Sequence, residues 1–577
     1  MKRSCIITFV FLIMCSPVYA FVRGRSFLMP RSQSVHAERE LVGWQDAINL
    51  NSDCCCDYAA LTLNAGYSHS FNSSNLTTYF FGTDRFVFSG SRVPRRSSDD
   101  ILADYFGLPL DFKSCVKFSP MIQNIFLDFN FFAGLDPLCP GMYVRGYVPF
   151  VQTRWNAGLC ERIINAGEMN DPAGYMASRE LKRSELAKSV TDFFKGERAI
   201  GDLQPLRYGR INGTREQAGL SDIHFALGWN PCLTDYYHFG FNVRVVVPTG
   251  STTKSIYFFE PLVGNGRHWG FGFGLTGHTI MWENDCGDRS WSIYGDLNGI
   301  HLFGSRHKRS FDLKKNGSSS RYMLIEELGN PVVQGLQVGD VPAEQQYHGV
   351  IMPAINQTTL TVNVDIAFEL DMVLKLSYKH NNVSWDVGYN LWGRTAERFH
   401  ARQSLPEKSF AVKGDAQMYG FDAEDEFVAL NVTQSQATMH AGQGLGNANR
   451  DFRNRNGDNS VDENGIGFDA TLNIAGNVIP LLQLRSDANI PPLVRDTVFG
   501  SKQAIFLTDC DIDNLSALSE SAVAHTVFTH ISYQWSECRS AVPFMGFGGE
   551  LSFDAGGLKR VCAVSEWSVW MKVGIAF

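Results

Sequence analysis

The sequence predicts an all-β protein, a transmembrane antiparallel β-barrel of about 12 strands (10–14), with short periplasmic turns and long extracellular loops. Two observations carry this prediction. One stretch of 22 residues, 358–379, has a single unbroken apolar face. The connections between strand-like segments also alternate between short and long along the whole chain.

In the stretch 358–379, nearly every even position is apolar and most odd positions are polar or charged, from Leu360 to Tyr378 and from Thr359 to Lys379. Successive side chains of a strand point to opposite faces, so this stretch has one apolar and one polar face. Strands of soluble proteins usually run about 3–10 residues, and this alternation holds for roughly twice that length. Such a strand is typical of a transmembrane barrel.

Eleven further segments show a similar alternation. Some are clear, such as 234–248, where Phe239, Phe241, Val243 and Val245 lie opposite the polar residues, and others are weak, such as 58–70. Together with 358–379 they make twelve expected strands, an even number as bacterial outer-membrane barrels have. The others are 121–135, 141–155, 221–230, 268–283, 290–303, 382–395, 522–535, 541–554 and 565–577. A hairpin from 409–421 and 467–478 would make fourteen.

Short connections are expected near Pro137, Pro231, Asp285, Asn381 and Cys538. The long ones are 71–120, 156–220, 249–267, 304–357, 396–521 and 555–564. Transmembrane barrels have short periplasmic turns and longer extracellular loops, so this alternation is what a barrel topology requires. A soluble β-sandwich has no reason to separate its loops in this way.

The N-terminus reads as a secretion signal over 1–20, with Lys2 and Arg3 before an apolar run that ends at Val18-Tyr19-Ala20. We therefore expect a signal peptide at 1–20, an N-terminal periplasmic segment at 21–57 and the barrel at 58–577, with long extracellular loops at 71–120, 156–220, 304–357 and 396–521. The formal net charge is -8 and no basic stripe is present, which argues against nucleic acid as a partner.

Thirteen cysteines are present, and eleven would remain after removal of the signal. An exported chain enters a compartment that permits disulfides, and the odd number leaves at least one thiol free or paired with another chain. Cys54, Cys55 and Cys56 are adjacent and cannot easily bond one another, so we predict cross-linking there to disulfide-linked neighbours. No CxxC pair or nearby histidine cluster supports a metal site, and we expect no metal and no cofactor.

The last strand, from Trp567 to Phe577, resembles the C-terminal signature of bacterial outer-membrane β-barrels, with apolar residues at alternate positions and a terminal Phe. This resemblance implies location in the outer membrane of a Gram-negative bacterium, contact with its lipid, and recognition of the strand by the barrel-assembly machinery. The run from Cys54 to Tyr58 resembles the cysteine-bearing first strand of major outer membrane porins from intracellular bacteria, which implies a porin-like protein.

The alternation also predicts which charged residues face the lumen, because a charge facing hydrocarbon costs about 2–4 kcal/mol at the membrane midplane. Charges of both signs are interleaved there, as in a diffusion porin for hydrophilic solutes. The predicted pore-lining residues are Arg145, Arg244, Asp296, Asp365, Glu369, Asp371, Lys375, Asp386 and Arg394.

The leading hypothesis is a passive outer-membrane channel for small hydrophilic solutes. One alternative is a surface structural or adhesion protein with a closed lumen, in which ion pairs fill the barrel and the loops carry the function. A less favoured alternative is an outer-membrane hydrolase. It needs a gathered catalytic set, whereas His525 and Ser532 lie on opposite faces of their strand, so we expect no enzyme.

Two loop segments carry further expectations. Residues 178–195 read as a helix that either packs on its own loop or folds into the lumen as a constriction or plug. Residues 451–465 cluster Asn and Asp as calcium loops do, but without EF-hand spacing, so an exposed outer loop competes with a Ca²⁺ site there.

Overall fold

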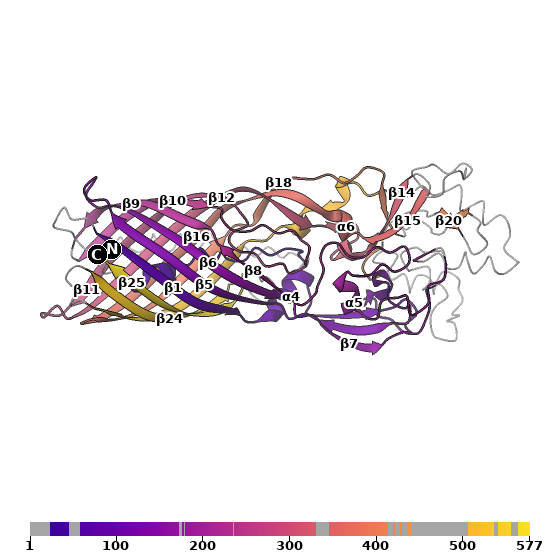
Figure 1. Cartoon of the computed structure of the whole chain (residues 1–577), viewed down its shortest axis with the longest axis horizontal. Helices are drawn as coiled ribbons and strands as arrows, with labels where there is room; N and C mark the ends of the chain where they lie inside the picture. The colour runs from indigo at the N-terminus through magenta and orange to yellow at the C-terminus, as the bar shows by residue number, and fades with distance from the viewer. Residues whose placement is uncertain are drawn as a thin grey trace, which may run out of the picture.

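The computed structural model describes residues 24–44, 58–171, 176–177, 179–234, 236–329, 346–413, 419–421, 427–429, 437–440, 506–535, 541–555 and 563–577. Along its longest axis the molecule divides into a barrel and an outer domain beyond one end of the barrel (Figure 1). Cys54, Cys55, Cys56 and the segment 451–465 lie outside the described residues.

Twelve antiparallel strands form the wall, in the spatial order β12-β11-β10-β9-β6-β5-β1-β25-β24-β23-β17-β16, and pairing of β16 with β12 closes the barrel. This confirms the predicted fold class and strand number. The twelve strands are β1 (Ala59–Ser70), β5 (Met121–Gly134), β6 (Met142–Asn156), β9 (Ile223–Leu233), β10 (Tyr237–Val247), β11 (Gly270–Glu283), β12 (Arg289–Ser310), β16 (Thr359–His380), β17 (Val383–Arg394), β23 (Ala522–Gln534), β24 (Val542–Asp554) and β25 (Glu566–Ala576).

An apolar belt surrounds the wall. On β10, the side chains of Tyr237, Phe239, Phe241, Val243 and Val245 point outward and are exposed, while the residues between them are buried. The other wall strands show the same arrangement, for example β17 and β25. A continuous exposed apolar band on a closed barrel is the surface that a bilayer covers.

The connections alternate in length as predicted. At one end β16 and β17 are joined by only residues 381–382, whereas at the other end β17 and β23 are separated by 395–521. The long strand β16 has two parts. On β16, Phe368, Leu374 and Leu376 are exposed on the outer face, but Leu360, Val362 and Val364 are buried in the outer domain. The N-terminal part of β16, from Thr359 to about Val364, therefore lies beyond the membrane, and the part from Phe368 onward crosses it.

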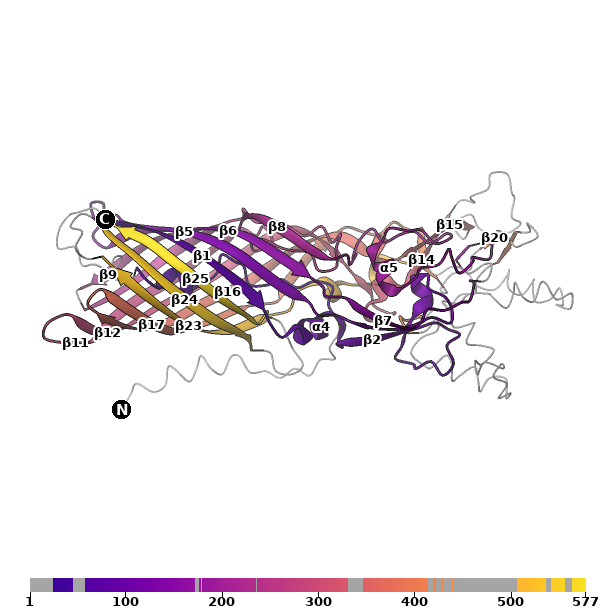
Figure 2. The same cartoon turned by 60° about the horizontal axis from the view of Figure 1, so that its bottom comes forward.

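The described parts of the long loops fold into one outer domain (Figures 1 and 2). It contains a four-stranded sheet of β3 (Ile101–Leu102), β2 (Arg85–Ser89), β4 (Lys113–Lys117) and β7 (Cys160–Asn165). A three-stranded sheet of β15 (Gln346–Pro353), β14 (Leu324–Gly329) and β19 (Phe410–Val412) lies with it, and two strands continue the wall outward: β8 (Thr214–Leu220) beside β6 and β18 (Glu397–Arg402) beside β16.

Small elements complete this domain. They are α4 (Ser73–Phe81), α5 (Val190–Lys195), α6 (Ile355–Thr358), η1 (Ala103–Phe106), η2 (Ser320–Tyr322), η5 (Asp509–Asp511), η6 (Asn514–Ala517), a pair of β13 (Asp312–Leu313) and β22 (Ile512–Asp513), and a pair of β20 (Tyr419–Phe421) and β21 (Phe427–Ala429).

One hydrophobic cluster joins most of these elements. It includes Phe80 of α4, Phe106 of η1, Phe194 of α5 and Ile325 of β14, all at most 5% exposed. The helix expected over 178–195 is confined to α5, with Ser189 as its N-cap, and its Val190, Phe193 and Phe194 pack into this cluster. That segment therefore packs within the outer domain and does not enter the lumen as a plug.

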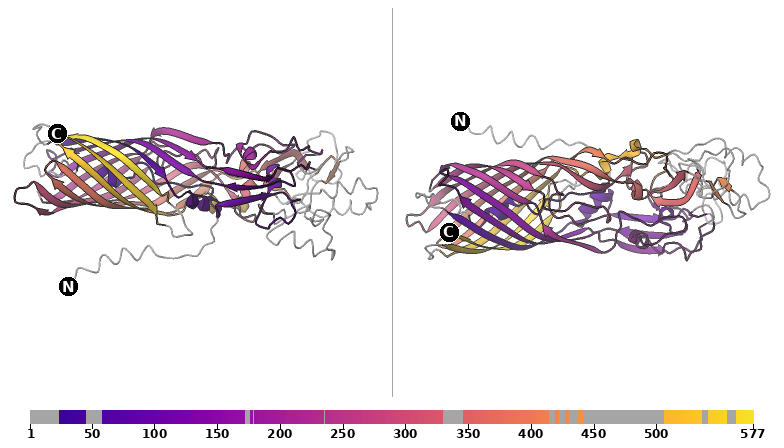
Figure 3. Two further views of the ribbon diagram at one scale, coloured as in Figure 1. Left: turned by 90° about the horizontal axis from the view of Figure 1, so that it is seen from below. Right: turned by 45° about the horizontal axis from the view of Figure 1, so that its top comes forward.

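Residues 24–44 run through the barrel from the outer end to the opposite end (Figure 3). Their one helix, α2 (Ala37–Leu41), is completely buried, and its neighbours are inward-facing wall residues. This part of 21–57, expected as a periplasmic segment, instead lies in the lumen. The reason is that its charges match charges on the inner wall, a complementarity between segments far apart in sequence.

Candidate functional site: a plugged lumen

The plug, defined as residues 29–44, is held to the wall at both ends of α2. The carboxylate of Asp371 on β16 accepts a hydrogen bond from the backbone N–H of Ala37, at 2.9 Å. At the other end Lys572 Nζ on β25 donates to the backbone oxygens of Arg39, Glu40 and Val42, at 3.0, 3.2 and 2.7 Å. Negative charge at a helix N-terminus and positive charge at its C-terminus satisfy the unpaired backbone groups there.

Ion pairs add to these backbone contacts. Arg31 Nη2 lies 3.2 Å from Asp371 Oδ1 and 3.1 Å from Glu38 Oε2. Glu40 Oε2 lies 3.0 Å from Nη2 of Arg145 on β6. The Nη1 atom of Arg145 is 3.4 Å from Asp296 on β12. These groups are buried. The plug is thus bound to strands on several sides of the barrel through charge-assisted contacts.

The inner end of the plug is anchored by Trp44, which is fully buried. Its ring meets Phe132 edge to face, and Arg145 and Lys572 lie over the indole at 5.5 and 4.9 Å from its centre. Gly43 precedes it with φ of 85°, and a Cβ there would lie 3.0 Å from the imidazole of His530. Both the backbone angle and the limited space therefore favour glycine at this position.

The outer end of the plug and the residues before it are tied to the outer domain. Ser32 Oγ donates to Asp222 at 3.0 Å, and Gln33 bonds to the backbone of Leu262 and Gly264 at 3.2 and 2.8 Å. Further out, Arg25 pairs with Glu520, and the ring of Phe27 lies under the guanidinium of Arg309. The segment therefore passes from the outer domain down the lumen.

The nine predicted pore-lining residues all have buried side chains on the inner side of the wall or at its outer end. Asp371 and Arg145 contact the plug directly. Lys375 Nζ lies 3.4 Å from Asp386 across neighbouring strands. Arg394 donates to Ser519 at 2.9 Å and Asp365 lies 2.8 Å from the ring of His400, so both belong to the outer end. The others are Arg244, Asp296 and Glu369.

Sequence reasoning missed the plug residues Arg31, Glu38, Arg39 and Glu40. It also did not predict that Lys572 of β25 binds the end of α2. One signal was present: the segment 31–44 carries charges of both signs and ends in a glycine-tryptophan pair, 15 residues before the first strand. Alternation could not reveal it, because a short helix inside a barrel shows no period of two.

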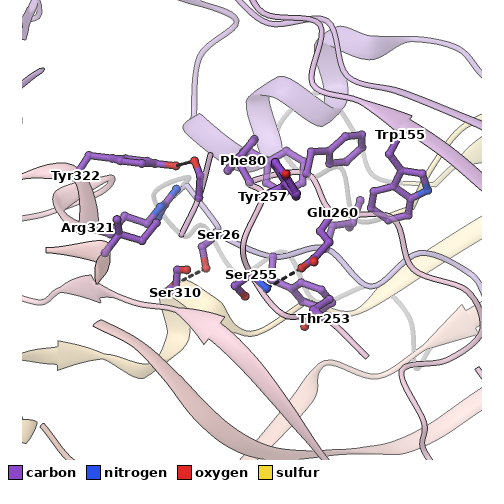
Figure 4. A pocket seen from close by; sticks show the side chains of 16 residues that line it. Ser26, Phe80, Trp155, Thr253, Ser255, Tyr257, Glu260, Ser310, Arg321 and Tyr322 are labelled. Carbon is purple, nitrogen blue, oxygen red and sulfur yellow. Dashed lines mark hydrogen bonds between the residues drawn. The ribbon is translucent and has the colours of Figure 1, made fainter. Parts of the chain in front are cut away.

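A second feature is a pocket where the outer domain meets the barrel, drawn in Figure 4. It encloses about 460 Å³ of space including its solvent-filled mouth, of which about 30 Å³ can hold the centre of a water molecule. Aromatic side chains line it together with hydroxyl groups and two charged residues. The lining includes Phe80, Trp155, Tyr257, Tyr322, Thr253, Ser255, Glu260 and Arg321.

The polar groups of this outer pocket are only partly engaged. Arg321 Nη1 bonds to Asp312 at 2.9 Å, while its Nε and Nη2 form no hydrogen bond among the described residues. Glu260 Oε2 accepts from the backbone N–H groups of Lys254 and Ser255, at 2.9 and 2.6 Å. Burial raises the pKa of Tyr322 to about 12, so its hydroxyl is neutral at physiological pH and donates to Gly209. Ser26 and Phe27, just above the plug, line the same pocket.

No family model matches the sequence, and no curated protein matches it. Among solved structures, an outer membrane channel from Pseudomonas putida F1 is similar at 8% identity over 92% of this chain and 99% of that one, with a TM-score of 0.30. A FadL homologue from Pseudomonas aeruginosa matches at 6% identity over 90% and 89%, TM-score 0.23. The outer membrane protease OmpT from Escherichia coli matches at 6% identity over 92% and 98%, TM-score 0.18.

The closed wall and its apolar belt define the class: the protein is a β-barrel of the bacterial outer membrane. In the described residues, no helix is both long and apolar enough to cross a membrane, a finding that does not concern strands. His525 lies on the outer face, where it contacts Tyr389, and Ser532 is buried on the inner face. The two are therefore separated as their alternation predicted.

Proposed function

We propose that this protein is an outer-membrane channel for small hydrophilic solutes, closed by its own N-terminal plug and opened when the plug leaves the wall. The observation that carries the proposal is the chemistry of the plug–wall interface. It consists of ion pairs and charge-assisted hydrogen bonds, including Arg31–Asp371, Glu40–Arg145 and Lys572 with the end of α2.

A permanently sealed barrel would gain stability from an apolar filling, because buried ion pairs are often no more stable than well-packed apolar residues. A plug that separates from its wall must instead leave two surfaces that are stable in water. Charged surfaces meet that condition, since each ion regains its hydration when the pair opens. Withdrawal of the plug would leave a wall lined by the predicted charges, as a path for hydrophilic solutes requires.

The outer pocket supports entry of the solute from the cell-surface side of the barrel. It combines flat aromatic faces with hydroxyl groups, Glu260 and Arg321, a lining that suits a small polar molecule with one apolar face. Because Ser26 and Phe27 line it, a solute bound there would contact the chain that leads directly into the plug.

The test is planar-bilayer conductance of the purified full chain and of R31A/E40Q, which removes the plug-side charges of two ion pairs. We expect few openings from the wild type and frequent openings from the double variant. R154A/E216Q is the matched control, because it removes an exposed ion pair of 2.6 Å between β6 and β8, away from the plug. Heat-modifiable gel migration confirms that each barrel has assembled.

A second candidate is a surface protein whose outer domain carries the function on a closed barrel. The large hydrophobic core of that domain favours it, since flexible loops alone would not need one. If the assembled R31A/E40Q variant stays as silent as the wild type, the channel proposal fails and this candidate replaces it.

A further inference from the structure

Three potential metal-binding side chains meet where the plug touches the wall. His36 and Glu38 belong to the plug, and Glu550 belongs to β24. One ligand atom from each lies within 4.8 Å of the others, and all three residues are buried. His36 Nδ1 and Glu38 Oε1 are 2.9 Å apart, at hydrogen-bond distance, and a separation of about 0.5 Å more would bring them to the spacing of two tetrahedral ligands with bonds of about 2.0–2.2 Å.

Each carboxylate is held through one oxygen by a neighbouring side chain, which leaves the other available as a ligand. Arg31 Nη2 bonds to Glu38 Oε2 at 3.1 Å. Ser568 Oγ donates to Glu550 Oε1 at 2.7 Å, while Glu550 Oε2 has no hydrogen-bond partner among the described residues, although Glu550 is only 6% exposed. Metal sites commonly orient their ligands through such second contacts.

The local charge also favours a cation. Two cations, Arg31 and Arg39, are close to the cluster, and each already has a carboxylate partner. Four buried carboxylates surround these two cations: Glu38, Asp128, Asp371 and Glu550. When all are ionised the group carries two negative charges in excess, which one divalent ion would neutralise.

A cavity beside the cluster, lined by His36, Arg39, Glu550 and Glu566, has about 30 Å³ of space for water. A water molecule there can complete a four-coordinate site. We propose that His36, Glu38 and Glu550 bind a divalent metal ion of the zinc class, which suits one imidazole and two carboxylates. Because two ligands come from the plug and one from the wall, the ion latches the plug. This latch rests on the proposed plugged channel, whereas binding of the ion does not.

The test uses the purified full chain with its thiols blocked by N-ethylmaleimide, so that cysteines cannot hold the metal. The chain is stripped with chelator, loaded with ZnCl₂, desalted and analysed for zinc. We expect about one Zn²⁺ per chain in the wild type. E550Q, which keeps the shape of the side chain, should lose that ion. E566Q is the matched control, because Glu566 lines the same cavity outside the cluster and should leave binding intact.

Hydrogen–deuterium exchange of peptides from 31–44 then measures the latch in the same samples. We expect zinc to slow exchange in the wild type and in E566Q but not in E550Q. Zinc-free wild type, or equal zinc in wild type and E550Q, would overturn the site. Zinc that binds through Glu550 without slowing exchange would overturn the latch. Neither readout depends on conductance, so failure of the channel proposal is recognised separately.

Discussion

Lys572 is the side chain whose removal should release the plug most directly. Its ammonium makes three hydrogen bonds to the end of α2 and lies over the ring of Trp44. Substitution K572M keeps most of the aliphatic chain but leaves three buried backbone oxygens without that donor. The side chain belongs to β25 and not to the plug, so the plug sequence itself remains unchanged.

The magnitude follows from the number and type of bonds lost. A hydrogen bond to a charged group contributes about 1.5–3 kcal/mol, and the three are not additive because they share one ammonium. K572M also removes the cost of burying the ammonium, which offsets part of the lost hydrogen-bond energy. A buried backbone oxygen left without a donor costs about 1–3 kcal/mol, and we take about 3–5 kcal/mol for the three together. At 1.4 kcal/mol for each tenfold change, the undocked fraction should rise by about 100-fold to several thousand-fold.

The assay is hydrogen–deuterium exchange of peptides covering 31–44, which reports docking whether or not the lumen then conducts. We expect exchange in K572M to quicken by a similar factor, with little change in peptides from the wall. K117M provides the control, since Lys117 is exposed on β4 of the outer domain. Protection of 31–44 equal to wild type, in a K572M barrel shown to be assembled by heat-modifiable migration, would refute the reasoning.

Three further predictions address other parts of the molecule. G43A should destabilise docking of the plug by about 1–2 kcal/mol, because alanine is strained at φ of 85°. G219A, which has open space around it, should leave docking unchanged. Hydrogen–deuterium exchange of peptides from 31–44 measures both effects. Burial raises the pKa of Asp104 from 3.8 to about 7, so the folded state binds this proton more tightly and the free energy of unfolding should fall by about 3 kcal/mol as pH rises from 4 to 7. D104N should reduce that slope in proteolysis of the outer domain, where buried Asp171 also has a raised pKa, and exposed D99N should keep it, so an unchanged slope in D104N would contradict the assignment. F577A should lower the yield of assembled barrel several-fold while leaving the plug protected, and a normal yield would argue against recognition of the last strand by the assembly machinery.

The sequence by itself determined the wall of this protein. A strand with lipid on one side and a polar lumen on the other must alternate with period two, and that pattern is local, so segments such as 234–248 can be read without knowing their neighbours. The alternation of short and long connections follows from the same topology. The inward direction of Asp371 and Lys375 was therefore predictable from their positions alone.

Only the tertiary structure decided what fills the barrel. Glu40 meets Arg145, and His36 approaches Glu550, through contacts between segments separated by up to 514 positions (550 minus 36). Such contacts depend on charge and shape across the closed lumen and leave no periodic trace in the chain. For the same reason the loops, read singly as surface segments, could not reveal that they share one hydrophobic core. The pattern of the twelve strands is determined by lipid on one face and a polar lumen on the other. The position of the plug is determined by wall residues that come together only when the barrel closes.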